Sequence, residues 1–274
     1  MTQEHLMLGT RSVRRIGYGA MRLPDDPSAA EALLHHALDL GVDHFDTARY
    51  YGAANERLAS VLRETVRDDV LVATKVGWAN DGTSPRPAPQ PEDLAASIHE
   101  NLRSLGVERL GLVNLRRGAA PGIPRVDVPI AEQLGALANL RDQGLIESIG
   151  LSAVSREELD EALALMPIAC VQNMFSVFVR RDVDVVHRCA EVGIAFVPFF
   201  PLGGGRMSEV EALVSVAARH RASIAQVALA WLLALGPHVL LIPGTSMAVH
   251  LEDNLRATDI RLSEEDRALL DTAV

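Results

Sequence analysis

Short apolar runs alternate with longer segments of helical period along most of the chain. The apolar runs predict eight strands, at Ile16–Ala20, Val42–Asp46, Val70–Thr74, Leu110–Leu115, Ile146–Leu151, Ile168–Gln172, Ile194–Pro198 and Val239–Ile242. The amphipathic stretches between them predict helices that begin near Ser28, Asn55, Pro91, Pro129, Ser155, Arg181, Glu209 and Met247. A strand and a helix repeated in this way indicate parallel strands, which either close into a (β/α)₈ TIM barrel or form an open doubly wound sheet.

Glycines at the ends of the predicted helices support this division. Gly41, Gly106, Gly144 and Gly193 each stand where a left-handed residue usually ends a helix. Residues His5–Leu8 and Arg11–Arg14 predict an N-terminal β-hairpin, and Ser223–Leu235 and Glu264–Leu270 predict extra helices. No linker rich in Pro, Gly or Ser divides the chain, so we expect residues 1–274 to form a single barrel domain.

Length, charge and cysteine content narrow the class of protein. The chain has 274 residues, and a (β/α)₈ barrel typically needs about 250. The net charge of −10 gives no support to nucleic acid or an anionic membrane as a partner, and composition indicates no oligomeric state. Cys170 and Cys189 lie in no metal-binding pattern, so no metal is expected. A signal peptide and an apolar stretch of about 20 residues are absent, which favours a cytoplasmic protein.

Polar and aromatic residues stand where the predicted strands end. In a (β/α)₈ barrel the chemistry lies at the carboxyl ends of the strands. The residues at these positions are Asp46, Lys75, Arg116, Ser152, Gln172, Phe199 and Thr245. Asp46 and Lys75 would face a partly desolvated cleft there, so we expect the two charges to pair.

Tyr50 and Tyr51 follow Asp46 directly. A tyrosine beside a lysine and a carboxylate is a suitable proton donor, and the ammonium is expected to lower the phenol pKa from its usual value of about 10. The alternative is an ordinary Asp46–Lys75 ion pair at the barrel rim, with Tyr51 as a packing residue.

Two loops have the character of an anion-binding site. Residues 201–205 (Pro-Leu-Gly-Gly-Gly) follow the seventh strand, and Gly244, Thr245 and Ser246 follow the eighth and open a helix. Loops at these two places commonly bind phosphate in TIM barrels, because backbone amides and a helix N-terminus meet there. The glycine run alone would equally suit a flexible loop.

The segment from Gly41 to Glu56 (GVDHFDTARYYGAANE) resembles the signature of the aldo-keto reductase family, G-x-x-x-F-D-T-A-x-x-Y-G-x-x-N-E. Further matches follow in order at residues 73–75, 150–152, 171–173, 242–244 and 251–254, so the resemblance runs from about Arg15 to Leu270. It implies a (β/α)₈ barrel that reduces a small aldehyde or ketone. Hydride would come from C4 of the nicotinamide, with NADPH as the usual cofactor, NADH as the alternative and no metal.

The resemblance also implies a role for each matching residue. Tyr51 matches the proton donor, and Asp46 and Lys75 match its activating pair. Ser152 and Gln172 match residues that bind the nicotinamide carboxamide, and Phe199 matches a ring that stacks on the nicotinamide. The positions around the pyrophosphate and adenosine are matched by Leu202, Gly203, Thr245 and Asn254. We expect Met21 and Trp78 to line the substrate pocket, although Trp78 could instead pack within its loop.

Arg116 departs from the family pattern, which has a histidine at the end of the fourth strand, and it is similar in this to a bacterial branch of the family. A guanidinium stays charged near neutral pH, but it can orient a carbonyl oxygen, lower the pKa of Tyr51 or pair with an anionic substrate group. Because of this departure, an alternative function is also compatible with the sequence: the protein would bind the cofactor as a sensor or accessory subunit with little reductase activity. A third reading is a barrel enzyme that handles a phosphorylated metabolite without nucleotide.

Residues that usually bind the 2′-phosphate of NADPH are also changed. Gly244 and His250 stand at the positions of the usual lysine and arginine, and Ala153 replaces an asparagine that contacts the carboxamide. Ser246 and His250 can replace the missing phosphate contacts, or they can simply cap and cover a helix.

Overall fold

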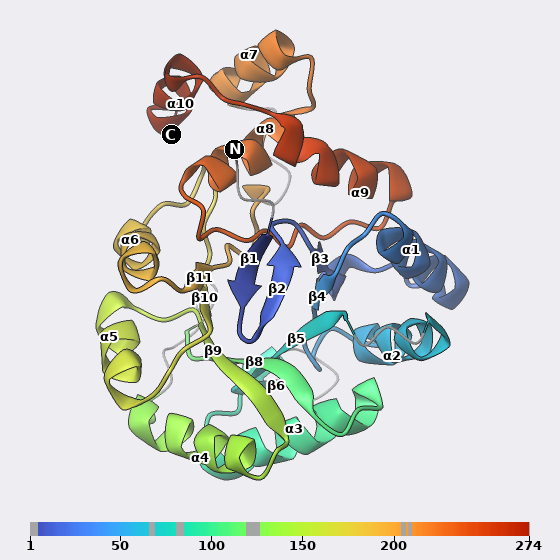
Figure 1. The fold of residues 1–274 in the computed structure, drawn as a ribbon, viewed down its shortest axis with the longest axis vertical. Helices are drawn as coiled ribbons and strands as arrows, with labels where there is room; N and C mark the ends of the chain where they lie inside the picture. Colours follow the sequence, from blue (N-terminus) through green and yellow to red (C-terminus); the bar gives the residue numbers. More distant parts are fainter. Residues whose placement is uncertain are drawn as a thin grey trace.

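A curved parallel sheet forms the centre of the computed structural model, which describes residues 5–65, 69–80, 85–118, 127–203, 207 and 210–273. Its seven strands are adjacent in the order β11-β10-β9-β8-β5-β4-β3 (Figure 1). In chain order they are β3 (Tyr18–Gly19), β4 (His44–Asp46), β5 (Leu71–Val76), β8 (Leu110–Arg116), β9 (Ile146–Ser152), β10 (Cys170–Gln172) and β11 (Ala195–Phe196).

The segment from residue 238 to 243 closes the sheet into a barrel. Val239 forms a parallel bridge with Phe196 of β11, and Leu241 forms another with Ile16, just before β3. The amide of Leu240 donates to the carbonyl of Phe196 (2.9 Å), and the amide of Gly17 donates to that of Leu241 (2.8 Å). The segment therefore takes the place of the predicted eighth strand, and the (β/α)₈ barrel is confirmed.

Helices surround the barrel (Figure 1). They are α1 (Pro27–Asp39), α2 (Ala54–Thr65), α3 (Pro91–Leu105), α4 (Ile130–Asp142), α5 (Arg156–Leu165), α6 (Val183–Val192), α7 (Glu211–His220), α8 (Ile224–Ala234), α9 (Ala248–Leu255) and α10 (Glu264–Asp271), with 3₁₀ turns η1 (Ala20–Arg22) and η4 (Arg256–Asp259). Four of the glycines predicted to end helices have φ between 67° and 84°. Ser155 and Ser223 form the side-chain caps of α5 and α8, each with a glutamate or glutamine three residues later.

One helix assignment is corrected. Residues 223–235 were expected to form a helix additional to those of the barrel. The helix is present as α8, but it packs against α9 and η4 and is buried from Gln226 to Leu232, as a barrel helix would be. Helix α7 instead lies outside α8, in contact with α8 and α10 (Figure 1). The nearly uniform apolar character of α8 is what a helix packed on several sides requires.

Two hairpins flank the barrel. The predicted N-terminal hairpin is confirmed as β1 (His5–Leu8) and β2 (Arg11–Arg14). Leu8 and Val13 pack with residues inside the barrel, including Leu71 and Ala195, which begin β5 and β11. This hairpin therefore covers the end of the barrel opposite the carboxyl ends of the strands. A second hairpin, which the sequence did not predict, pairs β6 (Trp78–Asn80) with β7 (Pro85–Pro87). Within the described residues, no helix is long and apolar enough to span a membrane.

Candidate active site

A buried ion pair joins the ends of two neighbouring strands. The Nζ of Lys75 on β5 donates to Oδ1 of Asp46 on β4 at 2.5 Å and to the carbonyl of Thr47 at 3.1 Å. The other oxygen of the Asp46 carboxylate accepts from Nε2 of Gln172 on β10 at 2.8 Å. Lys75 is 1% exposed and Asp46 4%, so the predicted pairing of these charges is confirmed in a dry environment.

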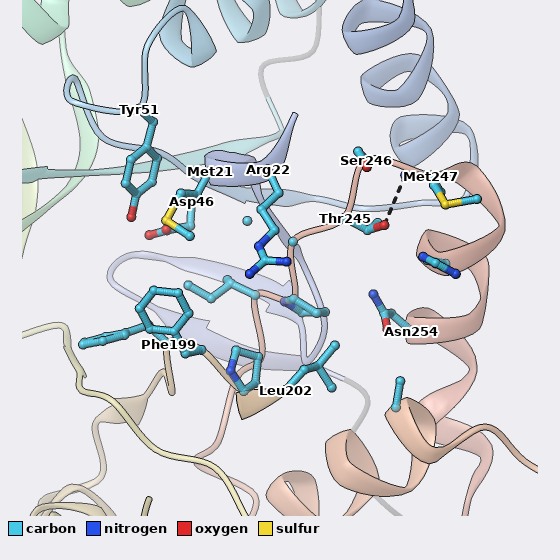
Figure 2. Close-up of a pocket in the computed structure, with 18 of the residues that line it drawn as sticks. Met21, Arg22, Asp46, Tyr51, Phe199, Leu202, Thr245, Ser246, Met247 and Asn254 are labelled. Atoms are coloured by element: carbon cyan, nitrogen blue, oxygen red, sulfur yellow. Dashed lines mark hydrogen bonds between the residues drawn. The ribbon is translucent and has the colours of Figure 1, made fainter. Parts of the chain in front are cut away.

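Tyr51 lies against this ion pair. The Nζ of Lys75 is 4.9 Å from the centre of the Tyr51 ring, and the ring meets that of Tyr50 edge to face at 5.0 Å. Tyr51 and Asp46 line the same cavity and point towards one another across it (Figure 2). A phenol, an ammonium and a carboxylate from separate segments therefore converge at the carboxyl ends of the strands.

The pKa of Tyr51 departs from expectation. Burial raises this pKa above its usual value, the negative charge of Asp46 acts in the same direction, and the positive charge of Arg116 opposes both. The prediction that the Lys75 ammonium would lower the pKa of Tyr51 is wrong, because the pKa is raised. Asp46, which is bonded to Lys75, offsets part of the lysine's charge, and desolvation of the phenolate dominates.

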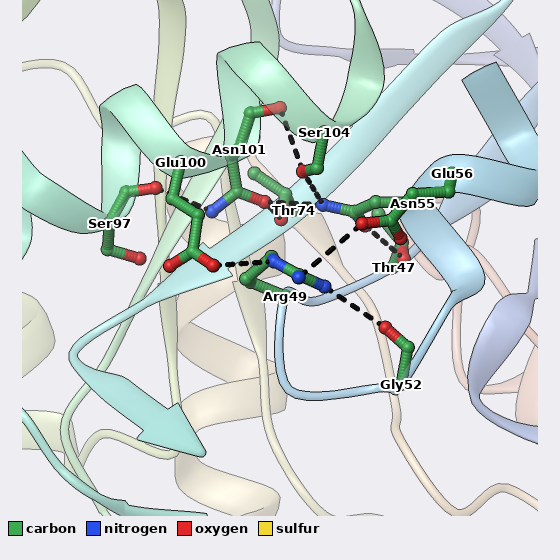
Figure 3. A network of polar contacts seen from close by, with 10 residues as sticks. All are labelled: Thr47, Arg49, Gly52, Asn55, Glu56, Thr74, Ser97, Glu100, Asn101 and Ser104. Atoms are coloured by element: carbon green, nitrogen blue, oxygen red, sulfur yellow. Dashed lines mark hydrogen bonds and ion pairs between the residues drawn. The ribbon is translucent and has the colours of Figure 1, made fainter. Parts of the chain in front are cut away.

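A network of buried amides and hydroxyls supports the loop that carries the two tyrosines (Figure 3). Asn55, in the first turn of α2, accepts from the hydroxyl of Thr47 at 2.8 Å and donates to Asn101 of α3 at 3.0 Å. The same amide nitrogen donates to Ser104 at 2.9 Å, and the Thr74 hydroxyl donates to Asn101 at 2.6 Å. The network ties the loop to β5 and α3, which fixes the backbone on both sides of Tyr51.

Arg49 ties the same loop from the outside (Figure 3). Its Nε donates to Glu100 at 2.8 Å and its Nη1 donates to the carbonyl of Gly52 at 3.1 Å. These contacts are partly exposed, so we expect them to contribute less to stability than the buried network.

We expect Asn101→Ala to lower the free energy of unfolding by about 2 to 3 kcal/mol, because it leaves the buried Thr74 hydroxyl without an acceptor and removes one bond of Asn55. Urea unfolding measures the change. Ser104→Ala is the matched control, since Asn55 keeps its bond to Asn101, and it should cost about 1 kcal/mol or less. Equal losses in the two variants would contradict the central place of Asn101.

A cavity of about 660 Å³ opens beside the tyrosine (Figure 2). Most of the site residues predicted from the sequence line it. They are Met21, Asp46, Tyr51, Trp78, Arg116, Phe199, Leu202, Thr245, Ser246, His250 and Asn254. The structure thus brings residues from η1, the strand ends and α9 to one place, while Gly204 and Gly205 of the predicted anion-binding loop lie outside the described residues.

Four predicted residues do not line the cavity directly. Lys75 is buried behind Asp46 and Tyr51, and Gly203, with φ of 61°, packs its backbone closely against the ring of Phe178. Ser152 and Gln172 end β9 and β10 and are almost fully buried. The Ser152 hydroxyl and the Gln172 carbonyl oxygen make no hydrogen bond within the described residues, so both are free to bind a polar ligand group.

The start of α9 forms the opposite side of the cavity. The Thr245 hydroxyl accepts from the amide of Met247 at 3.1 Å, and the Thr245 carbonyl accepts from the buried Tyr18 hydroxyl at 2.5 Å. Ser246 and His250 are exposed here, whereas Asn254 is buried. Backbone amides, hydroxyls and an imidazole therefore face the cavity near a helix N-terminus, an arrangement that suits an anion.

Arg22 is a lining residue that the sequence reading missed. It lies in η1, directly after β3, and its side chain extends into the middle of the cavity (Figure 2). The set of strand-end residues considered from the sequence began at the second strand, although the first strand end is an equally informative position. Tyr50, Phe200, Met207 and Met247 also line the cavity and were not assigned to it.

Arg116 lies between two aromatic rings. Its guanidinium carbon is 5.7 Å from the centre of the Trp78 ring and 5.1 Å from that of Phe199. Gly77 makes this possible, because its φ of 94° turns the chain and a Cβ there would come within 2.5 Å of the Arg116 carbonyl. The close passage of Gly77 places Trp78 beside the guanidinium.

Comparison with known proteins identifies the family to which the chain belongs. The model of the aldo/keto reductase family matches residues 15–274. The chain belongs to this family. The resemblance noted in the sequence is therefore confirmed, and this aldo/keto reductase is an oxidoreductase whose family carries out NAD(P)H-dependent carbonyl reduction.

The relatives cover nearly the whole reductase. Pyridoxine 4-dehydrogenase of Escherichia coli K12 is 41% identical over 285 residues, which cover 99% of this chain and 98% of that protein. The aldo-keto reductase yakc of Schizosaccharomyces pombe, whose name includes NADP(+), is 28% identical over 302 residues. The match covers 94% of this chain and 87% of that protein. The crystal structure of the thermostable aldo-keto reductase Tm1743 with the inhibitor epalrestat superposes with a TM-score of 0.84 at 30% identity, covering 99% of this chain and 100% of that one.

Proposed function

We propose that this protein reduces a small aldehyde or ketone to the alcohol with NADPH, and that pyridoxal is its first candidate substrate. The observation that carries the proposal is the convergence of Asp46, Lys75 and Tyr51 beside a cavity of about 660 Å³. The 41% identity to a pyridoxine 4-dehydrogenase supports the choice of substrate, because oxidation of pyridoxine at position 4 gives pyridoxal.

The residues present fit a nicotinamide dinucleotide. The unpaired Ser152 hydroxyl and Gln172 carbonyl oxygen offer hydrogen bonds to the carboxamide, and the ring of Phe199 offers a stacking surface. The Arg22 guanidinium and the amides at the start of α9 offer positive charge to the pyrophosphate. When bound, the nicotinamide supplies the hydride.

The cavity wall near α9 offers the remaining contacts. Leu202, Gly203, Thr245 and Asn254 would flank the pyrophosphate and adenosine. Ser246 and His250, exposed at the first turn of α9, would bind the 2′-phosphate of NADPH in place of the usual lysine and arginine. The NADP(+) in the name of the S. pombe relative supports this preference.

The protein side of the reaction is a proton transfer from Tyr51. Because burial raises the pKa of Tyr51, the phenol remains protonated at neutral pH and can donate to the carbonyl oxygen as it gains negative charge. The positive charges of Lys75, over the ring, and of Arg116 then stabilise the phenolate that is left. Asp46 holds the side chain of Lys75 in place.

Titration and turnover of the purified protein test this proposal. We expect NADPH to quench the fluorescence of Trp78, which lines the cavity, with lower affinity for NADH, and we expect NADPH to be consumed when pyridoxal is added. Trp78→Phe should remove most of the quenching, because Trp231 is stacked on Phe175 in the core. Tight binding without turnover across a broad aldehyde panel would support the sensor alternative. The absence of binding would support an enzyme acting on a phosphorylated metabolite.

A further inference from the structure

Among the residues that the structure describes, none pairs with the guanidinium of Arg116. It lines the cavity, and within the described chain it makes no hydrogen bond or ion pair, only contacts with the rings of Trp78 and Phe199. A charge in a partly enclosed apolar cleft is unfavourable unless an opposite charge or hydrogen-bond acceptors compensate it. The aromatic rings hold the guanidinium in place, and no carboxylate of the described residues neutralises it.

The other groups around Tyr51 are also hydrogen-bond donors. Among the described residues, the buried indole N–H of Trp78, which lines the cavity, has no partner. The oxygens of Asp46, the nearby carboxylate, already accept from Lys75 and Gln172. This end of the cavity therefore offers positive charge and donors, which complement a substrate rich in acceptor oxygens.

We propose that Arg116 determines substrate specificity by binding an anionic oxygen on the atom next to the carbonyl-bearing carbon of the substrate. The proposal rests on the proposed reductase function and narrows its substrate class to aromatic aldehydes with an ionised hydroxyl beside the formyl group. The planar guanidinium has several N–H donors in fixed directions, so it can bind this oxygen while Tyr51 donates to the carbonyl oxygen. A neutral histidine in the same place would offer one N–H and no charge.

Pyridoxal has this chemistry. Its ring oxygen at position 3 lies beside the formyl group at position 4, and the ring nitrogen and formyl group make that hydroxyl acidic enough to ionise at neutral pH. The flat faces of Trp78 and Phe199, which lie on the guanidinium, also border the space that an aromatic ring would occupy.

A matched pair of aldehydes tests the proposal. 3-Hydroxypyridine-4-carbaldehyde and pyridine-4-carbaldehyde differ by the one oxygen in question, and kcat/KM is measured for each at saturating NADPH. In Arg116→Gln we expect the ratio of the two values, hydroxylated over unsubstituted, to fall by about 10- to 100-fold relative to the unchanged protein, the loss typical of a hydrogen bond to a charged group. Comparing ratios cancels the intrinsic reactivity of the two aldehydes. Arg116→His should reduce the ratio similarly.

Arg22→Gln is the matched control, because it removes another cation from the same cavity. It should raise the KM for NADPH and leave the ratio of the two aldehydes unchanged. A ratio that stays constant in Arg116→Gln, with both aldehydes affected equally, would overturn the proposal and place Arg116 on the shared carbonyl or on Tyr51. The absence of turnover with any aldehyde in the unchanged protein would remove the proposed function and this inference with it.

A second measurement needs no variant. In the unchanged protein, kcat/KM for the hydroxylated aldehyde should fall relative to that of the unsubstituted one as the pH drops below the ionisation of the hydroxyl, because the neutral group loses the charge-assisted bond. Parallel pH profiles for the two aldehydes would contradict binding of an anionic oxygen.

Discussion

Replacing Tyr51 with phenylalanine should lower kcat for carbonyl reduction by about 10²- to 10⁴-fold while leaving the affinity for NADPH unchanged. The variant keeps the ring on which the Lys75 ammonium lies and removes only the hydroxyl that would donate the proton. Neither nearby cation can replace it, because a guanidinium is a poor proton donor in proteins and Lys75 is bonded to Asp46 and Thr47. Single-turnover rates with pyridoxal and a parallel fluorescence titration with NADPH measure the two quantities.

Tyr50→Phe is the control for this experiment. Tyr50 is a second phenol on the same loop, its ring centre lies 5.0 Å from that of Tyr51, and it also lines the cavity. Tyr50 contacts Tyr51 and makes no bond to Asp46 or Lys75, so removal of its hydroxyl should change kcat only a few-fold. The reverse result, a large loss in Tyr50→Phe and a small one in Tyr51→Phe, would show that the proton comes from the neighbouring residue.

The barrel could be predicted because its periodicity is local. Each strand and helix has its own apolar pattern, and even the short eighth segment, which makes single bridges on each side, was visible as Val239–Ile242. The β6–β7 hairpin could not be predicted, because proline-rich segments indicate loops. Its pairing of Trp78 with Pro87 depends on the folded chain. The exchange of roles between α7 and α8 has the same cause, since sequence gives helices but not their neighbours.

The site was predictable as far as strand ends determine it. Asp46, Lys75 and Arg116 were found because the carboxyl ends of parallel strands meet at one face. Burial, in contrast, is a property of the assembled cavity. This is why the predicted direction of the Tyr51 pKa shift was wrong. It is also why the unpaired oxygens of Ser152 and Gln172 and the packing of Arg116 between two rings could not be foreseen.

The Asp46–Lys75 ion pair serves both stability and activity, so Lys75→Met should lower both. Removing one member of a buried ion pair leaves the other charge uncompensated, so we expect Lys75→Met to lower the free energy of unfolding by about 3 to 5 kcal/mol at neutral pH. Urea unfolding measures the loss.

The double variant Asp46→Asn/Lys75→Met separates the two roles of the pair. It removes both charges, and the asparagine oxygen can still accept the hydrogen bond from Gln172, so stability should return to within about 1 to 2 kcal/mol of the unchanged protein. Carbonyl reduction should stay as low as in Lys75→Met, because no ammonium then stabilises the phenolate of Tyr51. Recovery of activity together with stability would mean that the ion pair serves the fold alone and that Lys75 takes no part in the chemistry.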